Sequence, residues 1–422
     1  MRIAIIGSGG REHSICQKIY ESKNVEKIFC IPGNGGTYKI ANNIEIKLND
    51  FDKIKSFLIT EKIDLTIVGP EEPLVNGIVD YLSQNDLKVF GPDKFCSRLE
   101  GSKIFTKKIC EIENIPTAKF KIFSDQNKCL KYLESCNFPI VVKADGLAAG
   151  KGVYICENLS DSQNAVREVF NGKFGKAREI LIEEFLTGEE MSFFILYDNE
   201  TFKVFNTAQD HKRVFEGDKG KNTGGMGAYC PSRLSSSKLE KKIIDKIIKP
   251  TLNFLKRKKG KYIGFLYAGL MIKNEEPFLI EYNVRMGDPE CQTILPLLQN
   301  DFVDVVKNCV DGNLANIELN WKKAKSICIV LTSKGYPEKF EKNVLINNLE
   351  NLKIKNQQFI FHAGTKFNDN KFYSNGGRVL NFVSIDENLE IARDDSINLI
   401  KRLDWKNGHH RNDIGYRVIG KK

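Results

Sequence analysis

The chain has 422 residues, of which 41% are apolar and 28% are charged. This balance is typical of globular proteins and excludes a disordered chain, and no window approaches the roughly 18 consecutive apolar residues of a membrane span. The eleven cysteines include no Cys-x-x-Cys pair, and only four apolar residues precede Gly7. We therefore expect a cytoplasmic protein with reduced thiols and no signal peptide.

The net charge of +10 is spread along the chain and mixed with acidic residues. The densest basic run, 256–261, ends a helical pattern, where the helix dipole favours cations. We see no basic patch interleaved with aromatic residues. We therefore expect no nucleic-acid or membrane partner, and keep a basic nucleic-acid-binding module as the alternative class of function.

Short apolar strands alternate with helical patterns through the first hundred residues. Each strand is followed by Gly, Pro or Asn, which is the rhythm of βαβ units in a parallel sheet. The expected strands are 2–6, 27–31, 65–68 and 89–90.

A helical pattern begins near Ser102, and from residue 140 the strands lengthen and follow one another directly. We interpret them as antiparallel hairpins, with strands at 140–143, 153–156, 180–185, 191–197 and 202–206. A long amphipathic helix follows Ser237, with a bend expected at Pro250. Strands are expected again at 326–331, 360–363 and 378–383, before a helix at 389–403.

These changes of pattern predict three domains, with boundaries near 102 and 322. The expected fold class is α/β and α+β, beginning with a parallel α/β domain and ending with a small α+β domain. The domains comprise residues 1–102, 103–321 and 322–422.

A glycine turn, Gly7-Ser-Gly-Gly10, directly follows the first strand, where a helix N-terminus can hold a phosphate. A dinucleotide-binding turn would have glycine at position 12, which is Glu12, and an acid after the second strand, which instead runs into Pro32. The residues favour a site for a small anion over a nicotinamide cofactor or a plain tight turn.

A second glycine turn lies in the segment from Lys143 to Gly152 and carries Lys151. It is not a P-loop, because only three residues separate Gly146 from Gly150, and a glycine stands where Ser or Thr would bind magnesium. Glycine permits close backbone approach and lysine supplies positive charge, so the segment suits the phosphates of a nucleotide. The alternative is a flexible hairpin with solvated lysines.

A third glycine-dense stretch, 222–229, follows the sequence Asp210-His-Lys-Arg213. Glycines beside a histidine, a lysine and an arginine favour an anionic ligand. The alternative is a plain surface loop.

The segment 277–287 gives the clearest geometry. With the two-residue period of a strand, one face carries polar residues and the other apolar ones, namely Glu281, Asn283 and Arg285 against Ile280, Tyr282 and Val284. The two oxygen donors suit Mg²⁺, which takes hard oxygen ligands shared with substrate phosphates, and the arginine would meet an anion. The alternative is a half-exposed antiparallel strand with its polar residues outward.

Nine motifs occur in an order that resembles one enzyme family. They are Gly9-Gly-Arg-Glu-His13, Pro32-Gly-Asn34, Gly69-Pro-Glu71, Leu99-Glu-Gly-Ser-Lys103, the segment from Lys143 to Gly152, Asp210-His-Lys-Arg213, the segment from Asn222 to Gly227, Gly287-Asp-Pro-Glu290 and Asn375-Gly-Gly-Arg378. Together they cover essentially the whole chain and resemble the phosphoribosylamine–glycine ligases (glycinamide ribonucleotide synthetases), ATP-grasp enzymes of purine synthesis. The resemblance implies an N-terminal phosphoribosylamine-binding domain, a central two-lobed ATP-grasp fold with a mobile lobe at about 120–190, and a small C-terminal domain.

The resemblance also implies roles for individual residues. The implied ATP-binding residues are Lys103, Lys143, Lys151, Glu183, Glu184, Phe185, Leu186 and Glu190 (or Glu189), and the implied metal ligands are Glu281 and Asn283. The implied substrate-binding residues are Gly10, Arg11, Asn34, Glu71, His211, Lys212, Arg213, Gly225, Asp288, Lys366 and Arg378. We assign the catalytic step to Arg285, Lys143 and Asp210. The strand at 265–272 has no carboxylate where many ATP-grasp enzymes place another metal ligand, so the number of metal ions stays open.

The implied reaction uses ATP with Mg²⁺ or Mn²⁺ to join glycine to 5-phospho-β-D-ribosylamine, giving glycinamide ribonucleotide, ADP and phosphate. Because a carboxylate is a poor electrophile, glycine is first phosphorylated and the amine then attacks the glycyl phosphate. No side-chain nucleophile is needed, so His13 and His211 are interpreted as binding or proton-carrying groups. We expect a monomer. The nearest rival function is that of another purine-pathway ATP-grasp ligase, such as the formate-dependent transformylase or the aminoimidazole carboxylase.

Overall fold

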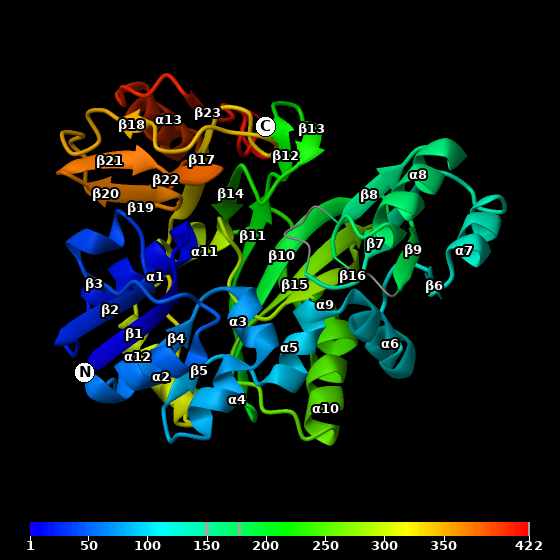
Figure 1. Ribbon diagram of the computed structural model, residues 1–422, viewed down its shortest axis with the longest axis horizontal. Coiled ribbons are helices and arrows are strands. Elements are labelled where there is room, and N and C mark those ends of the chain that lie inside the picture. The colour runs from blue at the N-terminus through cyan, green and yellow to red at the C-terminus, as the bar shows by residue number, and fades with distance from the viewer. Residues whose placement is uncertain (148–151, 176–178, 421–422) are drawn as a thin grey trace.

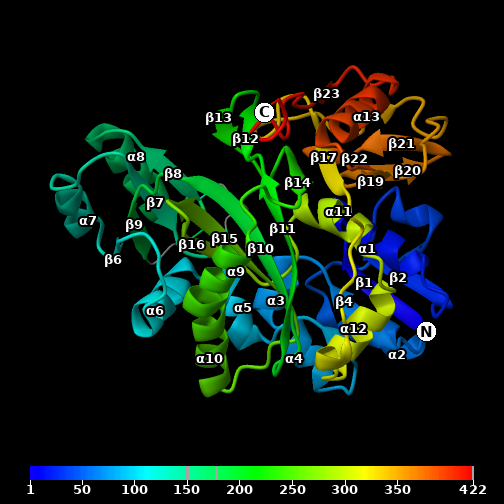
Figure 2. The ribbon, with the colours of Figure 1, turned by 180° about the vertical axis from the view of Figure 1, so that it is seen from behind.

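The computed structural model describes residues 1–147, 152–175 and 179–420. Figure 1 colours the chain from the N-terminus to the C-terminus, and Figure 2 shows it from behind. No helix in the described ranges is long and apolar enough to cross a membrane.

The first hundred residues form a parallel sheet of five strands in the order β3-β2-β1-β4-β5. The strands are β1 (Arg2–Gly7), β2 (Lys27–Pro32), β3 (Asn42–Asn43), β4 (Leu65–Val68) and β5 (Val89–Phe90), and the helices are α1 (Gly10–Tyr20), α2 (Phe51–Thr60), α3 (Glu71–Asn76), α4 (Ile78–Ser83) and α5 (Lys94–Gly101). The parallel sheet confirms the prediction from the βαβ rhythm. Its order reverses between β1 and β4, so the loops after these strands open onto the crevice where open α/β sheets bind ligands.

A second body, residues 120–184, is called the small lobe here. Its antiparallel sheet has the order β6-β9-β7-β8 and packs its own apolar core against two helices. Its elements are β6 (Phe120–Phe123), α7 (Gln126–Leu133), β7 (Ile140–Ala144), β8 (Val153–Cys156), α8 (Leu159–Phe170) and β9 (Ile180–Glu184), and α6 (Lys103–Glu113) leads into it. In both views the lobe projects away from the N-terminal sheet and from the C-terminal part (Figures 1 and 2).

A nine-stranded sheet forms the centre and continues into the C-terminal part. Its order is β16-β15-β10-β11-β14-β17-β22-β19, and β23 pairs with β17. The strands before residue 300 are β10 (Glu189–Tyr197), β11 (Phe202–Asp210), β14 (Gly227–Cys230), β15 (Gly264–Lys273) and β16 (Glu276–Asn283), and those after it are β17 (Lys325–Ser333), β19 (Gln358–His362), β22 (Arg378–Asp386) and β23 (Gly408–His409). Strands from both sides of the predicted boundary near 322 therefore belong to one sheet.

Smaller elements surround this sheet. They are the hairpin β12 (Arg213–Phe215) and β13 (Lys219–Asn222), the sheet of β18 (Leu345–Ile346), β20 (Thr365–Asn368) and β21 (Lys371–Ser374), and the helices α11 (Glu290–Ile294), α12 (Phe302–Val310) and α13 (Leu389–Lys401). Short 3₁₀ turns lie at Thr37–Lys39, Leu295–Leu297 and Leu314–Asn316.

The long amphipathic helix contains an irregular turn. It runs as α9 (Ser237–Ile243), a π-helical turn (Ile244–Ile248) and α10 (Lys249–Arg257). Pro250 has no N–H to donate, and a widened turn immediately before a proline relieves the clash of its ring with the preceding turn. The irregularity predicted at Pro250 therefore takes the form of a π turn.

Candidate functional site

Buried lysines surround one carboxylate where the small lobe meets α6. Lys143, near the end of β7, lies 2.8 Å from Glu183 Oε2 on β9, and Lys107 of α6 lies 3.2 Å from Glu183 Oε1. The three side chains are only 7%, 2% and 4% exposed for Lys143, Lys107 and Glu183. Burial alone would raise the pKa of Glu183. The two ammonium groups together lower it by more than burial raises it, so the net shift is downward.

Asp145 and Gly146, which follow Lys143, contact the N-terminus of α6. Asp145 accepts hydrogen bonds from the Ser102 hydroxyl and from the Ile104 N–H, both at 3.1 Å, and Lys103 donates to the carbonyl of Gly146 at 2.9 Å. Burial and the nearby charge of Lys143 lower the pKa of Lys103, with Glu281 opposing them. The structure therefore brings Lys103 and Lys143 together, while Lys151 lies outside the described residues.

The predicted adenine hinge connects the small lobe to the nine-stranded sheet. Glu184 accepts a hydrogen bond from the Lys119 N–H at 2.9 Å, and Phe185 is 38% exposed between β9 and β10. Leu186 follows in the same connection and is partly buried. The hinge thus begins directly after Glu183, the carboxylate that pairs with the two lysines.

Two acids follow the hinge at the start of β10, and both are ion-paired. Glu190 lies 2.6 Å from Lys212, which lowers the pKa of the glutamate, whereas Glu189 pairs with Arg233. Glu190 is the one of the two that lines the central cavity, together with Met191, Ser192, Asp210, Lys212, Tyr267, Gly269, Leu270, Ile280 and Glu281.

The strand predicted to carry a metal has a bulge. Tyr282 and Val284 are buried in the core as predicted, but Ile280 lines the cavity beside Glu281. The prediction that Ile280 shares the buried face was wrong, because the register shifts there: Glu281 lies opposite Gly269, and Leu279 lies opposite Leu270. An extra residue in one strand re-aims the side chain.

The donor set of β16 fits a hard divalent cation that is completed by a phosphate. Glu281 and Asn283 are partly buried oxygen donors, and their side chains form no hydrogen bond to any described residue. The described ranges contain no group of three or more His, Cys, Asp or Glu suited to a metal. Such a site matches Mg²⁺, which is commonly held by one or two protein oxygens and by substrate phosphates.

Asp210 is a partly buried residue whose Oδ1 is enclosed by the protein. Its Oδ1 has no hydrogen-bond partner among the described residues, and burial, with the charge of Glu290 adding to it, raises its pKa well above the ordinary value. Gly225 has φ of +112°, and a Cβ there would lie 2.9 Å from Asp210 Oδ1 and 2.5 Å from Pro289 Cδ. The glycine loop can therefore lie directly against this carboxyl only because residue 225 has no side chain.

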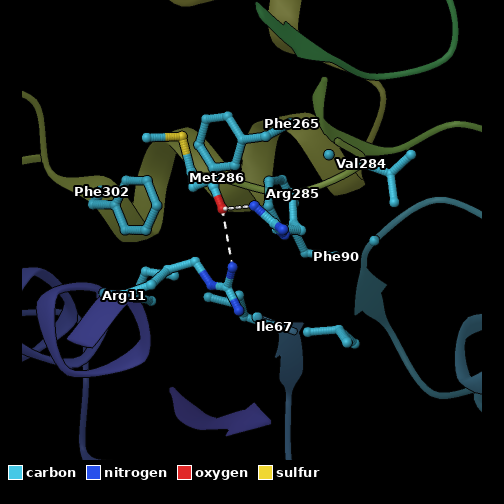
Figure 3. Close-up of a pocket in the computed structure, with 13 residues that line it drawn as sticks. Arg11, Ile67, Phe90, Phe265, Val284, Arg285, Met286 and Phe302 are labelled. Atoms are coloured by element: carbon cyan, nitrogen blue, oxygen red, sulfur yellow. Dashed lines mark hydrogen bonds between the residues drawn. The ribbon is translucent and has the colours of Figure 1, made fainter. Parts of the chain in front are cut away.

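Two arginines meet beside the crevice of the parallel sheet. Arg11 and Arg285 both donate to the carbonyl of Met286, at 3.1 and 3.2 Å, as Figure 3 shows. Arg285 also lies 3.3 Å from Glu71 and 2.7 Å from Glu100. The charge of Arg285 is the largest influence on Glu71 and lowers its pKa to about 2. Arg11, Glu71 and Arg285 thus lie together, from α1, α3 and the segment after β16.

The segment after Arg285 joins the N-terminal and C-terminal parts. Asp288 accepts from the Arg11 N–H at 3.3 Å and lies 3.2 Å from Arg378 Nη1, which also donates to the carbonyls of Asp288 and Gly224, both at 2.5 Å. Gly10 lies in the same junction, where a Cβ would come within 2.3 Å of Asn381. Arg378, Asp288 and Gly10 therefore lie where the N-terminal domain, the segment after β16 and the C-terminal part meet, which is called the junction here.

Asn34 and Lys366 lie on opposite sides of another contact between the N-terminal and C-terminal parts. The Asn34 amide donates to the carbonyls of Ser8 and His362, at 2.9 and 2.8 Å, and its oxygen accepts from Gly36 and Thr37. Lys366 is exposed on β20, and Gly35 donates to the adjacent Thr365 carbonyl. Both the nitrogen and the oxygen of the Asn34 amide are therefore used to connect loops, whereas the side chain of Lys366 lies at the surface.

His211 and Arg213 are predicted substrate residues whose side chains contact other parts of the protein. His211 is 0% exposed, accepts from the Gly415 N–H at 3.2 Å, and its pKa is lowered to about 3 by burial. Arg213 donates to the carbonyl of Gly220 at 2.7 Å within the β12–β13 hairpin. The structure does not bring these two side chains to the cavity of Asp210.

Sequence reasoning missed Lys107, Glu100 and Glu290. Each is a charged residue that the fold buries: Lys107 beside Glu183, Glu100 beside Arg285, and Glu290 hydrogen-bonded to Ser192 at 3.1 Å. Lys107 carries the clearest local signal, because the exposed Lys108 continues the polar face while Ile104 and Ile109 place residue 107 near the apolar one.

Successive parts of the chain match three domain families. Residues 1–100 match "Phosphoribosylglycinamide synthetase, N domain", residues 101–291 match its "ATP-grasp (A) domain", and residues 326–417 match its "C domain".

Named relatives and a solved structure align along the whole chain. A phosphoribosylamine–glycine ligase of Fusobacterium nucleatum is 43% identical over 98% of both chains, and one of Mesorhizobium japonicum is 42% identical over 100% of this chain and 99% of its own. The crystal structure of a phosphoribosylamine–glycine ligase from Thermotoga maritima superposes with a TM-score of 0.83 at 30% identity, and covers 98% of this chain and 100% of its own.

Proposed function

The chain belongs to the phosphoribosylglycinamide synthetase family, and from that membership we infer that it is an ATP-dependent ligase that joins glycine to 5-phosphoribosylamine. It combines an N-terminal parallel α/β domain, a central ATP-grasp fold and a C-terminal domain. It is an enzyme of purine biosynthesis.

The course of the segment 281–290 supports a single site for both substrates. The segment 281–290 runs without interruption from the oxygen donors of β16, past Arg285, to Asp288 and Glu290. It leads from Glu281, whose charge acts on Lys103, to the junction that contains Arg11 and Arg378. A phosphoryl donor on one side and a phosphorylated amine on the other would therefore meet along a single stretch of backbone.

We propose a two-step route. A carboxylate oxygen of glycine attacks the γ-phosphorus of ATP, the bond to ADP breaks, and glycyl phosphate forms. The amine of phosphoribosylamine then attacks the carbonyl carbon, the carbon–oxygen bond to phosphate breaks, and the amine loses a proton. Both steps need placement and charge stabilisation rather than a protein nucleophile.

Lys103 and Lys143 are proposed to hold the phosphates of ATP, and the hinge at 183–186 to meet adenine. Glu190 is proposed to meet the ribose, in exchange for its present partner Lys212. The family uses ATP with a divalent metal ion. We propose Mg²⁺ or Mn²⁺ on Glu281 and Asn283, where it would offset charge on the transferring phosphoryl group.

Phosphoribosylamine is proposed to occupy the junction of the three parts, with its phosphate near Arg11 and Arg378. Arg378 uses Nη1 for the protein, whereas its Nε and Nη2 donate to no described residue. A guanidinium can bind a phosphate through such a remaining pair of donors. Asp210, whose pKa is raised by burial and by the charge of Glu290, is proposed to accept the amine proton in its ionised form.

Nothing in this assignment requires a second subunit, and we propose a monomer in the cytoplasm. The decisive experiment measures ADP release from the purified chain with ATP, Mg²⁺ and freshly generated phosphoribosylamine, with glycine omitted and then restored. ADP release is expected only with glycine. Release that depends on formate or bicarbonate instead would assign one of the rival purine-pathway ligases.

A further inference from the structure

Lys107 is a buried lysine that the substrate assignments do not use. Its side chain is 2% exposed, and its ammonium donates to the Thr117 hydroxyl at 2.5 Å and lies 3.2 Å from Glu183 Oε1. Burying an ammonium is expensive, and an apolar side chain of similar length would fill the same space without that penalty. Packing alone therefore does not account for a lysine at this position.

The neighbourhood of Lys107 contains more positive than negative charge. Lys107 and Lys143 share a single carboxylate, one on each oxygen of Glu183. Burial lowers the pKa of Lys107, and the charge of Lys143 lowers it further, while Glu183 opposes both. Two buried cations on one anion leave the cluster with an excess of positive charge, which favours the approach of another anion.

Lys107 has a second hydrogen-bond partner besides Glu183, whereas Lys143 has none among the described residues. The Thr117 hydroxyl that accepts from Lys107 donates in turn to the carbonyl of Leu279 at 2.6 Å, on the strand that carries Glu281. The Leu279 N–H donates to the carbonyl of Pro116 at 2.7 Å, which ties the same two segments together. Lys143 has Glu183 as its one side-chain hydrogen-bond partner in the described ranges.

We propose that Lys107 is a positioning residue, the standing counter-ion of Glu183 that allows Lys143 to leave this carboxylate and turn to the phosphates of ATP. Without Lys107, the departure of Lys143 would strand an unpaired buried carboxylate, which is strongly unfavourable. With it, Glu183 stays paired in both arrangements. The proposal rests on the proposed function only in taking ATP as the anion.

The test is a double-mutant cycle read out as equilibrium binding of Mg·ATP, without glycine or phosphoribosylamine. Lys107→Met is expected to raise the dissociation constant for ATP at least tenfold and to leave that for adenosine, which has no phosphate, within twofold. Lys108→Met, one residue along the same helix and exposed, is the matched control and should bind ATP like the parent chain.

The second arm introduces Lys107→Met into a Glu183→Gln chain. A neutral amide at this position no longer holds Lys143 by charge. Removing Lys107 from the Glu183→Gln chain should therefore raise the dissociation constant for ATP less than twofold. This pair also removes the buried charge together with its partner, which keeps the comparison available if Lys107→Met alone does not fold.

The idea is overturned if the tenfold loss persists in the Glu183→Gln background, since Lys107 would then attract ATP directly or act through packing. An equal loss for adenosine and ATP also overturns it, as does a parent chain that does not bind ATP. Glycine-independent ADP release with intact ATP binding would contradict the proposed function while leaving this inference standing.

Discussion

Arg285 and Glu100 form an ion pair of 2.7 Å beneath the substrate junction. The same carboxyl accepts from the Val284 N–H at 2.8 Å, and the same guanidinium lies 3.3 Å from Glu71. One arginine thus serves two acids whose pKa values move in opposite directions. Burial raises the pKa of Glu100 to about 7 although Arg285 opposes it, whereas Arg285 lowers that of Glu71 to about 2.

The raised pKa of Glu100 predicts a pH-dependent loss of stability. Its pKa is 4.5 unfolded and about 7 folded, so its contribution is fully present below pH 4.5 and is lost as the pH rises through 7. Glu100→Gln keeps an acceptor for Val284 and should flatten the change in the free energy of unfolding between pH 5 and 8, by up to about 3 kcal/mol. Urea unfolding at both pH values measures this. An unchanged slope, as expected for the exposed control Glu111→Gln, would contradict the prediction.

Removing Lys143 should impair catalysis without unfolding the chain. Lys143→Ala deletes a charge that is proposed to bind the ATP phosphates, while Glu183 keeps Lys107 as a partner. We expect kcat/KM for ATP to fall at least tenfold, roughly 1.4 kcal/mol of transition-state stabilisation. Steady-state kinetics of a folded variant measures it, with the exposed Lys128→Ala on the same lobe as control. Parent-like turnover would reject Lys143 as a phosphate-binding residue.

The two faces of β16 should respond differently to substitution. Glu281→Gln should raise the Mg²⁺ concentration needed for half-maximal activity, because the proposed metal site loses its charged oxygen donor. Tyr282→Phe loses the hydrogen bond of 2.5 Å to Thr251 inside the core, and should lower stability by about 1 kcal/mol at an unchanged Mg²⁺ requirement. Titration of activity with Mg²⁺ compares them. The same metal dependence in both variants would mean that the metal site lies elsewhere.

Arg378 should contribute to phosphoribosylamine binding as well as to the junction. Arg378→Lys keeps a cation near Asp288 but loses the paired donors that bind a phosphate, so KM for phosphoribosylamine should rise several-fold. The KM values for ATP and glycine should change little, and likewise the melting temperature. Arg402→Lys, at the exposed end of α13, is the control. A lower melting temperature with all three KM values unchanged would show that Arg378 is a structural tie alone.

Local pattern was sufficient for most elements of the fold. The strands Leu65–Val68, Val89–Phe90 and Val153–Cys156 have the predicted bounds, because turn residues delimit each apolar run. The bulge at Ile280 could not be predicted, since the register shift depends on the partner strand β15 and not on the alternation within β16. The division of the antiparallel strands between two sheets likewise depends on long-range pairing.

The candidate site was predictable where the residues that act together are also close in the sequence. Examples are Lys143, which directly precedes its glycine turn, and Glu281 and Asn283, which are two residues apart. It was not predictable where burial decides the role. Lys107 belongs to a helix whose other lysines are the exposed Lys108 and Lys103, which donates to the carbonyl of Gly146, and only the fold places Lys107 against Glu183. Arg285 similarly acquires Glu71 and Glu100 from segments about 200 residues away, which no spacing rule connects.

The pairing of β14 with β17 fixes the order in which a newly made chain can be completed. Gly227 lies opposite Ile329, about 100 residues later, and pairing at such separation follows loop closure rather than leading it. During synthesis β14 therefore keeps an open edge until β17 has left the ribosome, and open edges invite pairing with other chains. A chain that stopped near residue 322 would end its central sheet at β14 with this edge exposed. Translation beyond β17 is therefore a condition for protecting the central sheet from pairing with other chains.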